Sequence, residues 1–127
     1  MHGIVIALLL LVSPAAARDF GQWEAQPPEV RQWFQKLKRP DIPWLSCCGE
    51  ADAYWADAFE VDAGGYVAII TDQRLDGPLG RPHRGVGERI VVPDSKIKWD
   101  AGNPTGHGII FLGTGGQVYC YVPPGGV

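Results

Sequence analysis

Three cysteines and two histidines carry most of the chemical potential of this sequence, once a short N-terminal segment is set aside. They are Cys47, Cys48, Cys120, His83 and His107. Thiols form disulfides, bind soft metals or act as nucleophiles, and an imidazole serves as a metal ligand or a general base. The surroundings and spacing of these residues indicate which chemistry is available.

The surroundings of Cys120 favour a structural disulfide. Alternation within residues 118–122 places Cys120 on the valine side, which we expect to face the core. It places Tyr119 and Tyr121 on the opposite, outer side, where they either stack on a ligand or are covered by the N-terminal helix. A buried cysteine in an exported chain is more often bridged than reactive.

Two adjacent cysteines are available as the partner of Cys120. We take Cys48 as the partner, with Cys47 as the alternative partner or a free thiol. Either bridge closes a loop of more than 70 residues, which the chain-entropy model values at about 4 kcal/mol. The cysteines could also form a strained vicinal Cys47–Cys48 bridge or stay as three thiols.

A metal or thiol-redox site is the second hypothesis for the cysteine pair. Its candidate ligands, for copper or zinc, are Cys47, Cys48, Asp52 and His107. Their spacing matches no zinc-finger pattern, so we expect no metal or cofactor. A third hypothesis makes Cys48 and His107 the nucleophile and base of a thiol hydrolase, although nothing in the sequence places them together.

Two loops rich in Gly and Pro are where we expect ligand binding. They cover residues 72–88 and 100–108, and a loop longer than connectivity requires is often functional. Together with the outer face of the last strand, they supply the candidate ligand-binding residues: Arg81, His83, Arg84, Asn103, His107, Tyr119 and Tyr121. Because no catalytic set converges, we expect a non-enzymatic binding or cell-envelope accessory module, with an envelope protein or a glycan as partner.

The elements that position these residues are one helix and several short strands. Val30, Trp33, Phe34 and Leu37 form one apolar stripe after Pro27-Pro28, which predicts a short helix that ends before Pro40. Period-two patterns predict strands at residues 54–61, 66–71, 89–92, 97–99, 109–112 and 117–122. We expect a mainly β fold, either a small SH3-like barrel or a sandwich of five to six short strands, with one N-terminal helix and a disulfide.

An apolar run at residues 4–12, followed by Ser13-Pro14 and Ala15-Ala16-Ala17, is typical of a secretory signal peptide. We therefore expect a signal peptide at 1–17, a lead-in and helix at 18–46, and a β-rich body at 47–127 that forms one domain with the helix. The mature chain would be bacterial, and periplasmic or secreted. The run is too short to cross a bilayer, so no membrane span is expected in the mature chain.

Charge is divided along the mature chain. Seven acids and no base lie between Arg39 and Arg74, and six bases against three acids follow from Arg74 to Lys98. This division indicates either two surfaces that attract one another or an acidic patch for a cation or a basic partner. A net charge of −3 gives no electrostatic basis for binding nucleic acid.

Several short motifs give the chain a resemblance to other proteins. They are Pro28-Glu29-Val30 with Trp33-Phe34, Cys47-Cys48-Gly49-Glu50-Ala51-Asp52-Ala53, Val91-Val92-Pro93 and Cys120-Tyr121-Val122-Pro123-Pro124. In these motifs the chain resembles a set of small, exported bacterial proteins without an assigned activity. The resemblance implies an envelope location and a bridge at Cys120, and it implies no functional residues.

Overall fold

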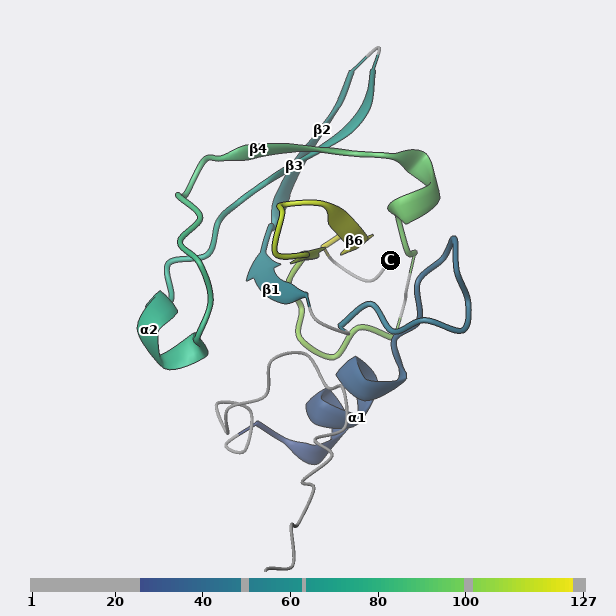
Figure 1. The fold of residues 1–127 in the computed structure, drawn as a ribbon, viewed down its shortest axis with the longest axis vertical. Helices are drawn as coiled ribbons and strands as arrows, with labels where there is room; N and C mark the ends of the chain where they lie inside the picture. Colours follow the sequence, from purple (N-terminus) through teal and green to yellow (C-terminus); the bar gives the residue numbers. More distant parts are fainter. Residues whose placement is uncertain (1–25, 49–50, 63, 100–101, 125–127) are drawn as a thin grey trace, which may run out of the picture.

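The computed structural model describes residues 26–48, 51–62, 64–99 and 102–124. The expected signal peptide and most of the lead-in lie outside these residues. The elements, in chain order, are α1 (Pro28–Lys36), β1 (Asp52–Trp55), β2 (Ala58–Asp62), β3 (Gly65–Ile69), α2 (Asp76–Leu79), β4 (Arg89–Val92), the 3₁₀ helix η1 (Asp94–Lys96), β5 (Ile109–Leu112) and β6 (Val118–Val122) (Figure 1). Within the described part of the chain, no helix is both long and apolar enough to cross a membrane.

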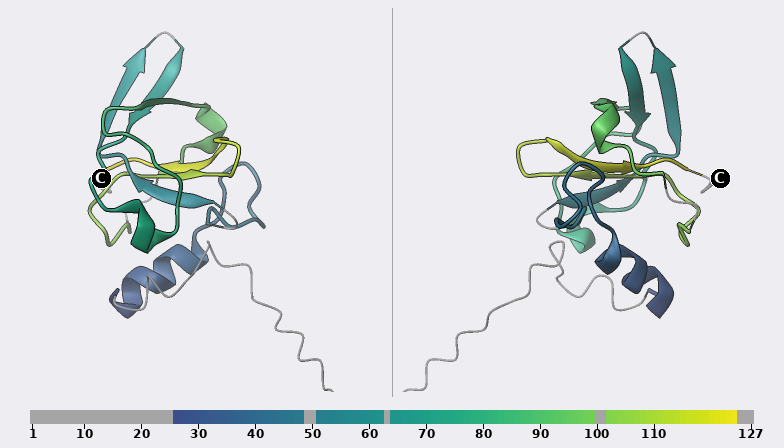
Figure 2. Two further views of the ribbon diagram at one scale, coloured as in Figure 1. Left: turned by 60° about the vertical axis from the view of Figure 1, so that its left-hand side comes forward. Right: turned by 90° about the vertical axis from the view of Figure 1, so that its right-hand side faces the viewer.

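The strands form two antiparallel sheets of three strands, which confirms a mainly β fold. The sheet orders are β1-β5-β6 and β2-β3-β4. The strands that the structure describes are not joined into a closed barrel, so an SH3-like barrel stays a prediction. The β2–β3 hairpin extends beyond the rest of the molecule as an arm (Figures 1 and 2).

The sheet β1-β5-β6 is covered on both faces, and all four residues of β5 are buried. Tyr54 and Tyr121 belong to a cluster with Ala68 and Val92 of the other sheet. On the opposite face, Phe111 and Cys120 belong to a cluster that includes residues of α1 and of the segment that follows it. This two-sided burial explains why β5 is a continuous apolar run rather than an alternating one.

The expectation that Tyr121 lies on an outer face is wrong, because that face is buried too. Tyr121 is 0% exposed, and its hydroxyl donates to the carbonyl of Ala56 at 2.9 Å. Burial raises the pKa of Tyr121 above its usual range. Tyr119 is half-buried beneath the guanidinium of Arg39, 3.8 Å from the ring centroid, so neither ring is an open platform for a sugar.

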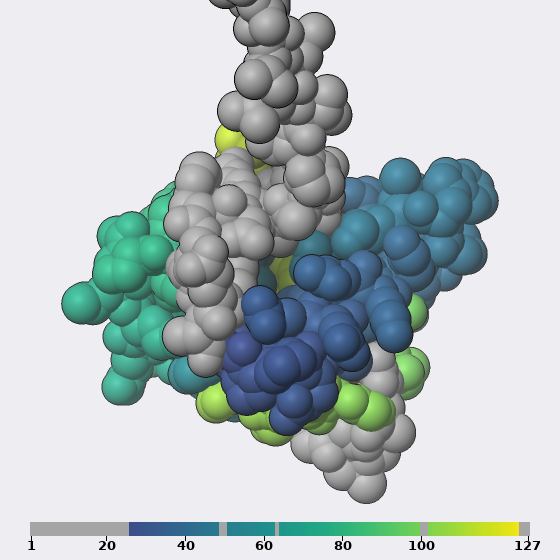
Figure 3. Space-filling model, turned by 90° about the horizontal axis from the view of Figure 1, so that it is seen from below, coloured from purple at the N-terminus to yellow at the C-terminus, as the bar shows by residue number. Residues whose placement is uncertain are grey.

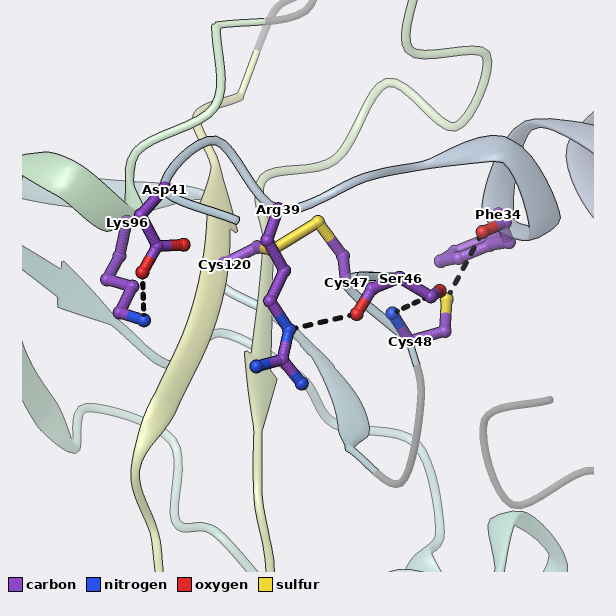
Figure 4. Close-up of a disulfide and its surroundings, with 8 residues drawn as sticks. All are labelled: Phe34, Arg39, Asp41, Ser46, Cys47, Cys48, Lys96 and Cys120. Atoms are coloured by element: carbon purple, nitrogen blue, oxygen red, sulfur yellow. Dashed lines mark hydrogen bonds and ion pairs between the residues drawn. A yellow bond between two sulfur atoms is a disulfide. The ribbon is translucent and has the colours of Figure 1, made fainter. Parts of the chain in front are cut away.

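A disulfide joins Cys47, after α1, to Cys120 in β6, with the Cα atoms 5.5 Å apart (Figure 4). The bridge is confirmed, but the choice of Cys48 as its partner is wrong. The backbone N–H of Cys47 donates to the carbonyl of Leu37 at 2.9 Å, and this places the Cys47 side chain in the core. Cys48 points toward α1, where its thiol donates to the carbonyl of Phe34 at 3.3 Å.

The predicted strand at residues 54–61 is two strands that belong to different sheets. The chain changes sheet at Ala56 and Asp57, where the N–H of Ala56 donates to the carbonyl of Gly108 at 2.7 Å. The predicted strand at residues 97–99 is also wrong. The 3₁₀ helix η1 ends just before these residues, and Ile97 makes an isolated bridge to Tyr121 instead of belonging to a strand.

Candidate functional site

The candidate site is a cleft of about 350 Å³ between the N-terminal end of α1 and the β1–β5 side of the sheet. Figure 3 shows this side of the molecule, where α1 (purple) lies between the long loop of residues 72–88 that contains α2 (green) and the segment after α1 (blue). The apolar lining consists of Pro27, Val30, Phe34, Ala53, Trp55, Pro104 and Ile109. The polar lining consists of Gln26, Arg74, Thr105 and His107. Pockets of this kind, apolar with a few polar groups, are typical of ligand sites.

Trp55, the last residue of β1, lies between two cationic or polar side chains. The imidazole of His107 is stacked on it, with ring centroids 3.7 Å apart and planes 6° apart. The guanidinium carbon of Arg74 lies 3.9 Å from the ring centroid. Two groups this close to one ring would collide on the same side, so they occupy opposite faces of the indole. The stack fixes the planes of three side chains that line one cleft.

Asp57 orients His107 within this stack. Its carboxylate oxygens lie 3.0 and 3.2 Å from Nδ1 of His107. Because an ionised carboxylate only accepts hydrogen bonds, Nδ1 carries a proton, and Nε2 is the acceptor of the ring in its neutral form. The N–H of Gly108, at 2.8 Å, and the hydroxyl of Thr71, at 3.2 Å, also donate to Asp57. Asp57 is thereby held in place by residues from two other parts of the chain.

The loop before His107 is built on Asn103. The side-chain amide of Asn103 donates to the carbonyl of His107 at 2.7 Å, and its oxygen accepts from the N–H of Thr105 at 2.9 Å. The N–H of His107 donates to the Thr105 hydroxyl at 3.1 Å. Asn103 therefore shapes the loop that presents His107, and Thr105 lines the cleft beside it.

Arg74 is held on the other face of Trp55 by Asp72. Its Nε and Nη2 donate to the two oxygens of Asp72 at 3.0 and 2.7 Å. The N–H of Trp55 donates to the same carboxylate at 3.0 Å. The Asp72 side chain is fully buried, whereas a quarter of the Arg74 side chain is exposed. The guanidinium therefore keeps donor capacity toward the cleft.

Arg81, in the long loop of residues 72–88, completes this network of hydrogen bonds around Asp72. Its side chain is 3% exposed; Nη1 donates to Asp72 at 2.7 Å and Nε donates to Asp76 at 2.9 Å. Nη1 also donates to the carbonyl of Ala53 in β1 at 2.9 Å. Arg81, a predicted ligand-binding residue, is therefore buried, and its hydrogen bonds attach the long loop to the sheet.

The other candidates of the long loop lie outside the cleft. His83, with a side chain 78% exposed, contacts Asp76 at 2.7 Å, and Arg84 pairs with Glu88 at 2.9 Å. Of the seven candidate ligand-binding residues, only His107 lines the cleft. Thr105 lines the cleft as a residue of the predicted binding loop 100–108, whereas Trp55 and Arg74 were not named as candidates. The available signal for Arg74 was its position in the loop 72–88.

Stability is expected to depend on pH through Asp72. Burial acts to raise the pKa of this carboxyl, but hydrogen bonds from Arg74, Arg81 and the N–H of Trp55 outweigh it and hold the pKa well below its usual range. The unfolded chain, with a pKa of about 3.9 for Asp, then binds the proton more tightly than the folded chain. The stabilisation is fully present above about pH 5 and is lost as the pH falls through the folded pKa.

The expected result is that unfolding followed by circular dichroism shows stability falling below about pH 5. In Asp72→Asn, the same acid limb should be shallower, because this group no longer takes up a proton on unfolding. An acid limb of equal slope in both proteins would contradict the assignment to Asp72.

The cysteine pair does not offer two thiolates. The sulfur of Cys47 is bonded to Cys120, and burial raises the pKa of Cys48 to about 12. A thiol with that pKa is almost entirely protonated at neutral pH. In the described part of the chain, no three His, Cys, Asp or Glu side chains are grouped to hold a metal ion, and this includes the set Cys47, Cys48, Asp52 and His107.

Three acids of the first charged segment are paired with bases of the second. Asp41 contacts Lys96, Glu60 contacts Arg89, and Asp72 contacts Arg81. The division of charge along the sequence therefore becomes a set of pairs that join distant segments of the fold.

Comparison of the chain with known protein families, with curated proteins and with solved structures found no match in any of the three.

Proposed function

We propose that the protein is an exported binding module that takes up a segment of another protein in the cleft beside Trp55. The observation that carries this proposal is the stack of Arg74, Trp55 and His107 over an apolar floor. It supplies a donor on one side of the indole, an acceptor on the other and room for an apolar side chain between α1 and the sheet.

The chemistry of the polar groups favours a peptide segment. Arg74 presents N–H donors, and His107 in its neutral form presents Nε2 as an acceptor. A backbone amide group offers the complementary carbonyl and N–H in each residue. The imidazole and the guanidinium lie 3.7 and 3.9 Å from the centroid of the indole, on its two faces. Successive amide groups of an extended segment can therefore meet both while the side chain between them enters the cleft.

Export belongs to the same proposal. A bridge between residues 73 apart in sequence is typical of chains that mature in an oxidising compartment, and the first 17 residues have the pattern of a signal peptide. These two features support a periplasmic or secreted location, where an envelope protein would be at hand as the partner.

Binding of the tripeptide Ac-Ala-Phe-Ala-NH₂, followed by isothermal titration calorimetry, tests the proposal. A ligand of this size is expected to bind with a dissociation constant on the order of 1 mM, and Ac-Ala-Ala-Ala-NH₂ is expected to bind much more weakly. Arg74→Met and His107→Phe retain a group that can pack on Trp55 but remove the donor and the acceptor. Each should weaken binding about tenfold.

His83→Phe is the matched control, because His83 is exposed and lies outside the cleft. Its affinity should equal that of the wild type. Equal binding of the two tripeptides, or equal loss in His83→Phe and His107→Phe, would contradict the assignment of the cleft as a peptide site.

A further inference from the structure

The β2–β3 arm carries an apolar face that continues outward from the core. Register places Val61 opposite Tyr66 and Phe59 opposite Ala68, so these four side chains share one face of the sheet. Ala68 is 0% exposed and belongs to the core, whereas Phe59 and Val61 are 40% and 64% exposed. The same face that is buried at the base of the arm is therefore uncovered toward its end.

Aromatic rings extend this face to the segment after η1. Phe59 stacks on Tyr66 with centroids 5.3 Å apart, and Tyr66 meets the edge of Trp99 at 5.8 Å. Trp99 is 64% exposed. Three rings in contact make a continuous apolar strip, and exposed strips of this kind mark interaction sites more often than scattered single residues do.

β2 is also an edge strand. The order β2-β3-β4 leaves one side of β2 without a neighbouring strand among the described residues, and all five of its residues are exposed. An edge strand offers unpaired backbone N–H and carbonyl groups to an incoming strand. Backbone pairing along β2 and apolar contact with Phe59 and Val61 can thus be made by one extended segment.

The charges on the arm indicate what that segment carries. Glu60 and Asp62 occupy the face of β2 opposite to Val61. Glu60 is paired with Arg89, but Asp62 has no ion-pair partner among the described residues, and neither has Asp94. Asp62 is opposite Gly65, and Oδ1 of Asp94 would lie 3.6 Å from a Cβ at Gly65. Two carboxylates without cationic partners therefore lie at the outer part of the arm.

A second copy of this chain fits poorly at this edge. Antiparallel pairing of two β2 strands centred on Glu60 would place each Glu60 opposite its copy, and like charges directly opposite are destabilising. A segment with basic side chains at alternate positions has the complementary charge.

We propose that the β2 edge binds an extended partner segment that alternates apolar and basic side chains. Its apolar side chains pack on Phe59 and Val61, its basic side chains face Glu60 and Asp62, and its backbone adds a fourth strand to β2-β3-β4. Strand addition of this kind takes affinity from the backbone and specificity from alternate side chains. The surface is separate from the cleft at Trp55 and does not depend on it.

The probe is a fluorescein-labelled peptide, Lys-Val-Lys-Val-Lys-Val-Lys, with binding followed by fluorescence anisotropy at low salt. The comparison peptide, Lys-Lys-Lys-Lys-Val-Val-Val, has the same composition without the alternation. We expect the alternating peptide to bind at least about fivefold more tightly, because only it meets an apolar and an acidic face at once.

Val61→Lys and Val91→Lys are a matched pair of variants. Both valines are exposed, at 64% and 67%, and both lie in strands of the same sheet but on opposite faces. Val61→Lys should weaken binding of the alternating peptide about tenfold, because it adds a like charge to the apolar strip. Val91→Lys should change binding less than about twofold, and His107→Phe, in the cleft, should leave it unchanged.

Three results would overturn the proposal. The first is equal binding of the two peptides, and the second is an equal loss in Val61→Lys and Val91→Lys. The third is a dimer in sedimentation equilibrium that Val61→Lys dissociates, because it would make the occupant a second copy of the chain. None of these three results bears on the cleft at Trp55, which is tested separately by tripeptide binding.

Discussion

Removing the disulfide in the double variant Cys47→Ala/Cys120→Ala is expected to lower the free energy of unfolding by about 4 kcal/mol. The bridge joins residues 73 apart, so its loss frees a long loop in the unfolded chain. Both sulfurs are also fully buried between α1 and the sheet. A domain of this size has about 5–15 kcal/mol of stability in total, and the variant should unfold at a much lower denaturant concentration.

Both cysteines are replaced together for a structural reason. Cys48 is adjacent to Cys47. If Cys47 alone were replaced, Cys120 could form a disulfide with Cys48 instead. Cys48→Ala is the matched control: it removes a buried thiol that donates to the carbonyl of Phe34 but leaves the bridge. It should cost about 1 kcal/mol.

Equilibrium unfolding in urea measures both values. A larger loss in Cys48→Ala than in the double variant would contradict the assigned bridge. The same holds if alkylation of the oxidised protein, unfolded without reductant, labels Cys47 or Cys120 instead of Cys48.

Replacing Arg81 with Met is expected to lower the free energy of unfolding by about 3 kcal/mol. The Arg81 side chain is 3% exposed, and its guanidinium bridges two carboxylates, Asp72 and Asp76, and donates to the carbonyl of Ala53. Met retains the apolar stem but leaves the fully buried Asp72 with one cationic partner, Arg74. The loss of one partner of a buried ion pair is costly because the remaining charge stays desolvated.

Arg84→Met is the control for Arg81→Met. Arg84 is in the same loop, and its pair with Glu88 is partly exposed on both sides, at 27% and 35%. Such a pair contributes about 0.5 kcal/mol or less. Adding Asp72→Asn to Arg81→Met should recover part of the loss, since it removes the buried charge. Equal losses in Arg81→Met and Arg84→Met would contradict the role given to Arg81.

The elements with a clear local signal were predicted from the sequence. The apolar stripe with Trp33 and Phe34 predicted α1, which extends over Pro28–Lys36. The period-two patterns at residues 66–71, 109–112 and 117–122 predicted the strands β3, β5 and β6 of the hairpins β2–β3 and β5–β6. In each case the pattern lies within a few consecutive residues, and local propensity and tertiary packing agree.

The errors arose where distant contacts decide the structure. No Gly or Pro marks the break between β1 and β2 in the sequence. The break depends on hydrogen bonds of Asp57 to Thr71 and to Gly108, which is 51 residues away. Spacing alone cannot show which of two adjacent cysteines forms the bridge to Cys120. In the structure, the hydrogen bond from Cys47 to the carbonyl of Leu37 places Cys47 in the bridging position. Alternation correctly separated Tyr121 from Cys120, but it carries no information on whether a second sheet covers the tyrosine face.

The cleft was the least predictable part of the molecule for the same reason. Trp55, Arg74 and His107 are separated by 19 and 33 residues in the sequence, and they meet only because Asp72 and Asp57 hold the two flanking side chains against the indole. The sequence identified His107 as a candidate from its residue type. The stack that gives it a partner and an orientation depends on the folded chain.

The most direct test of the peptide-binding cleft is a titration of ¹⁵N-labelled protein with Ac-Ala-Phe-Ala-NH₂, followed by NMR. We expect the largest shifts at the indole N–H of Trp55, the Nε of Arg74 and the amides of Val30 and Thr105, all residues that line the cleft. The exposed Trp44 and Trp99 provide indole signals that should not move. Shifts at Trp44 or Trp99 with none at Trp55, or no shifts at 10-fold the expected dissociation constant of about 1 mM, would contradict the account.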